Sequence, residues 1–142
     1  MTKSEGRMDM RPSGLRILNP DTMFDPAPMG FSQMAIIPAG ARTVHVAGQT
    51  GGAHKGDFAN QCRTALGSID TAMRAAGGTL LDVAKLTVYI VDHDKTKHSE
   101  LITAVGAAFG SRLVPTCTIV PLSQSGTSRD QLVEIEAVGV IV

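Results

Sequence analysis

Hydrophobic and polar residues along this chain follow two different periods. Over residues 58–76, apolar residues recur every three or four positions, which is the spacing of one face of an α-helix. Asp57 stands directly before this stretch as a natural N-cap, and the two glycines that follow it favour a left-handed helix end. A second stretch with the same period begins at Asp94 or Thr96 and ends at Gly110. The pattern therefore predicts two helices.

Shorter segments alternate with a period of two and are rich in β-branched residues, as strands are. Strands are predicted at residues 16–18, 31–37, 42–49, 84–91, 116–120 and 132–141. The order β-β-β-α-β-α-β-β indicates an α/β (α+β) fold, with two helices packed on one face of a six-stranded mixed sheet. Residues 1–14 follow neither period and are interpreted as a flexible N-terminal arm, ahead of a single domain over residues 15–142.

The last predicted strand indicates what covers the sheet. On one side its alternate residues are uniformly apolar, and we expect this side to face the helices. The other side mixes Glu134 and Glu136 with Leu132 and Val138. Such a side is too apolar for open water and too acidic for a sealed core. We therefore expect a homo-oligomer whose copies pack on this side and leave clefts between them.

Composition excludes several classes of function. Thirteen Lys and Arg balance thirteen Asp and Glu, and a formal net charge of zero does not favour nucleic-acid binding. No apolar run reaches the roughly 18 residues that a membrane span needs, and the N-terminus lacks the apolar centre of a secretory signal. The two cysteines fit no disulfide or metal framework. The expectation is a cytoplasmic protein with no nucleic-acid or membrane partner.

Two residue types carry candidate chemistry. A carboxylate on a half-buried strand, as at Glu134 or Glu136, either forms an intersubunit ion pair, accepts backbone amides, or positions and deprotonates a water molecule. Cys117 is either a small buried side chain or a thiol that lines a cleft, whereas Cys62 falls on the apolar stripe of the first helix. The four histidines have neither i,i+4 nor H-x-H spacing, so no metal is expected.

Five short motifs, in their order and nearly in their spacing, resemble the RidA/YjgF family of reactive-intermediate deaminases, also labelled L-PSP endoribonucleases. They are Phe31-Ser32-Gln33, Val46-Ala47-Gly48-Gln49, Thr87-Val88-Tyr89-Ile90, Pro115-Thr116-Cys117 and Leu132-Val133-Glu134-Ile135-Glu136-Ala137. The resemblance runs from about Arg16 to Val142. It implies a six-stranded sheet backed by two helices, in a trimeric, chorismate-mutase-like assembly with three clefts between subunits.

The resemblance also implies a site and an activity. Deaminating members hydrolyse an enamine, through its imine, to a carbonyl compound and ammonia, without a cofactor. The implied catalytic residues are Glu134 and Cys117, and the implied substrate-binding residues are Phe31, Ala47, Gly48, Gln49, Pro115 and Thr116. Arg112, on the loop three residues before Pro115, is this sequence's own candidate to reach the cleft in place of the arginine that the family has at Pro115.

This sequence departs from the family pattern at three of these positions. Pro115 replaces the arginine that holds the substrate carboxylate as a bidentate fork, Phe31 replaces a tyrosine, and Ala47 replaces a serine. We therefore expect a different imine, enamine or related labile small molecule as substrate. The alternative is a non-catalytic trimer that binds a small molecule or protects other proteins. Ribonuclease activity is disfavoured by the charge balance and by the absence of Trp.

Overall fold

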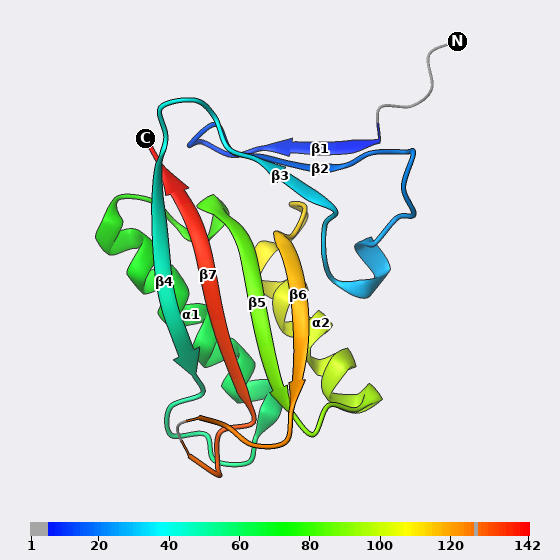
Figure 1. Ribbon diagram of the computed structural model, residues 1–142, viewed down its shortest axis with the longest axis vertical. Coiled ribbons are helices and arrows are strands. Elements are labelled where there is room, and N and C mark those ends of the chain that lie inside the picture. The colour runs from blue at the N-terminus through cyan, green and yellow to red at the C-terminus, as the bar shows by residue number, and fades with distance from the viewer. Residues whose placement is uncertain (1–5, 127) are drawn as a thin grey trace.

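Four strands and two helices make up the main layer pair of the computed structural model, which describes residues 6–126 and 128–142 (Figure 1). The sheet has the order β4-β7-β5-β6, in which β5 and β6 are parallel and the other neighbours are antiparallel. Both helices lie behind this sheet in Figure 1, so they cover one face and leave the other open. The bounds are β4 Arg42–Thr50, α1 Phe58–Ala76, β5 Val83–Val91, α2 Lys95–Phe109, β6 Thr116–Leu122 and β7 Val133–Ile141.

Local capping explains where the two helices begin and end. The Asp57 carboxylate accepts a hydrogen bond from the backbone N–H of Asn60, and α1 ends at Gly77 with a left-handed φ of 102°. Asp94 caps α2 in the same way by accepting from the N–H of Lys97. Both helices are confirmed, with the expected caps. Two 3-10 turns, η1 Ala27–Met29 and η2 Leu80–Asp82, join the remaining elements.

The two faces of β7 are also confirmed. Its odd-numbered residues, Val133, Ile135, Ala137 and Ile141, are buried in the main apolar core together with the inner faces of α1 and α2. Glu134 and Glu136 lie on the other face, which the helices do not cover. The period of two in the sequence therefore identifies which side of the last strand meets the helices.

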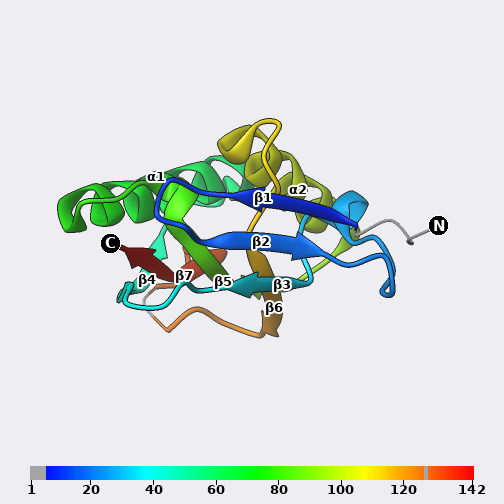
Figure 2. The same ribbon diagram turned by 90° about the horizontal axis from the view of Figure 1, so that it is seen from above.

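Three short strands form a second sheet, which lies across one end of the first (Figure 2). They are β1 Arg7–Met10, β2 Arg16–Asn19 and β3 Met34–Ile36, in the antiparallel order β1-β2-β3. The prediction of one six-stranded sheet is therefore wrong, because the described residues form seven strands in two sheets. The physical reason is a separate apolar cluster: Leu15 and Ile17 pack on Ala84, Leu113 and Val140, so β2 caps the main sheet instead of extending it.

The residues before β2 are ordered by a buried arginine. Arg11 is 2% exposed, its Nε donates to the carbonyl of Leu81 at 2.8 Å, and its two terminal nitrogens donate to the carbonyl of Leu113 and to Asp9. The prediction of a flexible arm is therefore wrong for residues 6–14, whereas residues 1–5 lie outside the described residues. A four-residue strand is too short for its period to stand out in the sequence.

Within the described residues, no helix is long and apolar enough to cross a membrane.

Replacing Arg11 tests whether the N-terminal strand belongs to the fold. Arg11→Met leaves the buried carbonyl of Leu113 and the half-buried carbonyl of Leu81 without this donor, and Asp9 without its ion pair, so we expect the free energy of unfolding to fall by about 2–4 kcal/mol. Urea unfolding followed by circular dichroism measures the change. Arg16→Met, at an exposed position on β2, is the matched control and should change stability by about 0.5 kcal/mol or less. Equal effects of the two substitutions would contradict the assignment.

Candidate functional site

A bulge in β4 brings Gly48 against the candidate carboxylate Glu134. The register between β4 and β7 shifts between Val46 and Gln49, so the chain bends there. A Cβ atom at Gly48 would overlap Oε1 of Glu134, so a side chain at this position would displace the carboxylate. The Gln49 side chain folds back and donates to the carbonyl of Ala47 at 2.9 Å. The structure thus places Gly48 against Glu134, whereas Gln49 is paired with Ile135, whose side chain lies in the helix-side core.

Two buried glutamines form hydrogen bonds with the loops next to this region. Gln61 of α1 is fully buried, and its amide nitrogen donates to the carbonyls of His54 and Asp130 at 2.7 and 2.8 Å. Its amide oxygen accepts from the N–H of Leu132, two residues before Glu134. Gln131 in turn accepts from and donates to the two glycines that follow β4. These bonds fasten both loops at this end of the sheet and fix the start of β7.

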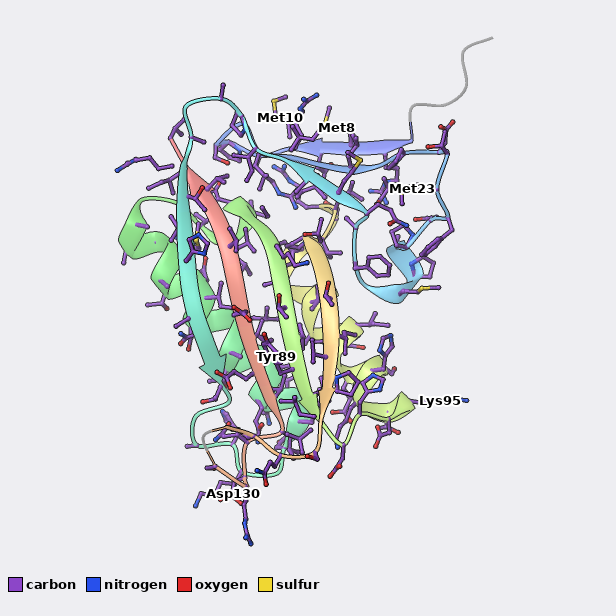
Figure 3. All side chains as sticks on the ribbon, viewed as in Figure 1. Met8, Met10, Met23, Tyr89, Lys95 and Asp130 are labelled. Carbon is purple, nitrogen blue, oxygen red and sulfur yellow. The ribbon has the colours of Figure 1, made fainter. Side chains whose placement is uncertain are left out.

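Tyr89 joins the same face, although the sequence reasoning assigned it no role. It lies opposite Glu134 in the β5–β7 register, and its hydroxyl donates to Oε1 of Glu136 (Figure 3). This hydrogen bond, followed by burial and the charges of both carboxylates, raises the pKa of Tyr89 above its ordinary value. The phenol therefore stays protonated beside two carboxylates. Its position two residues from Thr87 on an alternating strand was the signal that could have placed it here.

A hollow of about 440 Å³ lies at the other end of the open face, where the two sheets meet. Its walls include Thr116, Lys85 and Gln33. Lys85 is paired with Thr116 in the parallel register of β5 and β6, and its ammonium donates to the Thr118 hydroxyl at 3.2 Å. Lys85 is a cation next to Thr116 that sequence reasoning missed, because its neighbour lies 31 positions further along the chain.

Pro115 and Phe31 belong to the segment that borders this hollow. The carbonyl of buried Pro115 accepts from the N–H of Ser32 at 3.1 Å, and the Thr116 hydroxyl donates to the carbonyl of Ala84 at 2.7 Å. Phe31 itself turns to the helix side, where it lines a separate cavity of about 170 Å³.

Cys117 also turns to the helix side. It lies opposite Leu86 and lines the cavity that holds Phe31, among apolar residues of α2. Burial raises the pKa of its thiol to about 11, while the charge of Lys85 acts in the opposite direction, so the thiol is protonated at neutral pH and is a poor nucleophile. Burial likewise raises the pKa of Cys62 in α1 to about 12.

One copy alone does not bring Glu134 and Cys117 to one gap, so their place in a cleft between copies stays a prediction. Within one copy they lie on opposite faces of the sheet, because successive residues of a strand alternate between faces. They are also three residues apart along the strands, since Leu86 beside Cys117 pairs with Ala137; this is about 10 Å.

Arg112 is not brought to Glu134 either. It is exposed on the turn after α2, and its guanidinium donates to the carbonyl of Met10 in β1 at 3.4 Å. This contact places Arg112 beside the small sheet, whereas Glu134 lies at the opposite end of β7.

Comparison with known proteins identifies the family. A family model described as Endoribonuclease L-PSP matches residues 24–141. YyfB from Yersinia pestis, a protein of unknown function in the Rid family, has the same fold: the match covers 89% of this chain and 98% of that chain, with a TM-score of 0.81 and 28% sequence identity. The chain belongs to the RidA/YjgF family.

Two further relatives of this RidA/YjgF protein extend the comparison. A RutC family protein from Pyrococcus horikoshii is 35% identical over 120 residues, which cover 80% of this chain and 89% of the relative. E. coli TdcF, solved with bound serine, is 26% identical and matches 75% of this chain and 85% of its own, with a TM-score of 0.60.

Substituting Gly48 tests the close packing of Glu134 in this RidA/YjgF protein. In Gly48→Ala the new methyl group must displace Glu134, and we expect a loss of about 1–3 kcal/mol in the free energy of unfolding. Gly67→Ala is the matched control, because the helical Gly67 has open space around it; this variant should gain about 0.5–1 kcal/mol. Thermal unfolding measures both. A neutral or stabilising Gly48→Ala would contradict the described contact.

Tyr89 can be titrated directly because it is the single tyrosine of the chain. We expect the tyrosinate absorbance to rise with a midpoint above 10.0. Glu136→Gln removes the carboxylate that accepts the phenol hydrogen, so its midpoint should move down toward 10.0. Circular dichroism at the same pH values checks that the fold persists. A midpoint that is unchanged in Glu136→Gln would contradict the Tyr89–Glu136 hydrogen bond.

Proposed function

We propose that this protein hydrolyses a small reactive imine or enamine to a carbonyl compound and ammonia, in clefts between the copies of a homotrimer. The support comes from the open face of the main sheet, which holds a cationic hollow at one end and a packed carboxylate at the other. Membership of the RidA/YjgF family and the serine bound to the related TdcF agree with a small-molecule ligand.

One observation carries the proposal that the site is shared between copies. Lys85 at the hollow pairs with Val138 of β7, four residues from Glu134. Four residues of a strand span about 13 Å, which is more than one small substrate can bridge. A cleft in which the Lys85 end of one copy meets the Glu134 end of another would bring both groups to one ligand.

The proposed chemistry uses Glu134 as a general base. Its carboxylate takes a proton from a water molecule as the water oxygen bonds to the imine carbon, and the C=N electron pair moves to nitrogen, which is protonated. The resulting carbinolamine loses ammonia when Glu134 transfers the hydroxyl proton to the amine nitrogen, the C–N bond breaks and the C=O bond forms. One water molecule is consumed for each imine, and no redox change occurs. Lys85 provides a compact positive charge for a polar or anionic substituent, unlike the flat fork of an arginine.

A non-catalytic role is the second candidate, and Pro115 is the observation that favours it. Proline has neither a charge nor a backbone N–H to offer a substrate, and it stands where the deaminating members described in the sequence analysis have arginine. In this case the clefts bind a metabolite without converting it. Ribonuclease activity, which the description of the family model names, is not favoured by a formal net charge of zero.

Ammonia release from freshly generated short-chain imines distinguishes these functions. The panel contains imines that carry a carboxylate group and imines that are uncharged. We expect the full-length protein to exceed buffer, and Glu134→Gln to lose about 10²-fold or more of that rate because the general base is removed. Glu100→Gln, a carboxylate change on α2, is the matched control and should retain the rate.

The same assay reports on Lys85. Lys85→Met should raise the KM for carboxylated imines more than for uncharged ones, because only the former lose an ionic contact. Protein that is no faster than buffer across the panel, yet binds the products, would support the non-catalytic role. A Glu134→Gln variant as fast as the unchanged protein would overturn the assignment of the general base.

A further inference from the structure

Two histidines face each other where α2 begins, away from the open face of the sheet. Nε2 of His93 lies 3.3 Å from Nδ1 of His98, the ring centroids are 5.4 Å apart, and the ring planes meet at 85°. The four intervening residues fall within the H-x3–5-H spacing of the histidine pair in zinc fingers, although no closely spaced pair of cysteines accompanies it in this sequence. The pair arises from the conformation of the turn between β5 and α2.

That turn is fastened on both sides of His93. Asp92 adopts a left-handed φ of 48°, unusual for a residue other than glycine, and this turns the chain back toward the helix. The Lys97 ammonium donates to the carbonyls of Val91 and Asp92 at 2.9 and 2.8 Å, and the Lys97 N–H bonds to the Asp94 cap at 2.8 Å. His93 on the turn and His98 on the helix are therefore held in a fixed relation.

From this geometry we propose that His93 and His98 bind a divalent transition-metal ion of the zinc or nickel class. Two imidazole nitrogens, each about 2.0–2.1 Å from one tetrahedral ion, lie about 3.3–3.4 Å apart. The observed separation of 3.3 Å matches this value. Imidazole is a preferred ligand of zinc, nickel and copper ions, whereas magnesium and calcium prefer oxygen.

The rest of the coordination sphere is open. Among the described residues, no group of three or more His, Cys, Asp and Glu side chains is placed to hold an ion, so water completes the sphere. A hollow of about 460 Å³ beside the pair, lined also by Lys95, Ser99 and Thr103, has room for it. The affinity is therefore lower than that of a closed structural zinc site.

The charges around the pair permit a cation. Asp92 and Asp94 flank His93 in the sequence. The ammonium of Lys97 is bonded to two carbonyls. Lys95 lines the hollow beside the pair, and its side chain extends outward from the start of α2 (Figure 3).

Without an ion, a hydrogen bond joins the two rings: one nitrogen carries the hydrogen and the other accepts it. An ion about 2.0–2.1 Å from both nitrogens lies to one side of the line that joins them, and it can bind once the donating ring carries its hydrogen on its other nitrogen. His98 also lines the cavity that holds Phe31 and Cys117, so the ion fixes one wall of that cavity.

Calorimetric titration of the full chain with ZnCl₂ and NiCl₂, near neutral pH, tests the site. We expect one ion per chain, and His93→Asn or His98→Asn should each weaken binding about tenfold or more, since changes outside the ligand shell already cost that much. His45→Asn, at an exposed histidine on the open face, is the matched control and should bind as tightly as the unchanged protein. Thermal unfolding confirms that all three variants are folded.

Histidine ring signals in NMR spectra place the ion independently of the variants. Zinc should shift the signals of His93 and His98 together and leave those of His45 and His54 unchanged. Equal affinity in His93→Asn and in the unchanged protein, or shifts confined to His45, His54 or the cysteines, would overturn the proposal.

Discussion

The main constraint on this structure is that helices cover only one face of its four-stranded sheet. The helix side carries the continuous apolar core, so the other side must be satisfied in a different way. On it lie Tyr89, hydrogen-bonded to Glu136, and Glu134, packed on Gly48, next to apolar and half-buried neighbours. We propose a second copy of the same chain as the cover, because carboxylates and apolar residues are mixed on this face, and the proposed clefts arise from it.

Much of the fold could be predicted because strong periodic patterns of apolar residues are bounded by recognisable capping residues. The three- and four-residue spacing, the Asp57 and Asp94 caps and the terminal glycine of α1 all indicate the same two helices. β1 was missed because its four residues are too few to display a period, whereas β2 and β3 were predicted as strands but assigned to the main sheet. Burial of Arg11 was unpredictable for a different reason: its partners are carbonyl groups about 70 and 102 positions away.

The roles of the candidate site residues stay predictions, but strand parity shows which of them share a face within one copy. Gly48 lies against Glu134 because a bulge in β4 and the pairing with β7 place them side by side. Thr116 faces the open side of the sheet, whereas its neighbour Cys117 faces the helices. A shift of one residue in the register of β6 would exchange the two sides. Lys85 lies beside Thr116 because β5 pairs in parallel with β6, and no local motif in the sequence predicts that pairing.

The molar mass in solution tests most directly whether the open face is covered by identical copies. Light scattering coupled to size-exclusion chromatography, over a wide range of protein concentration, should give three times 14.9 kDa. Glu136→Lys, which introduces a positive charge on that face, should shift the mass toward a single chain, whereas Glu100→Lys on α2 should not. A stable particle of 14.9 kDa at all concentrations would contradict the shared cleft.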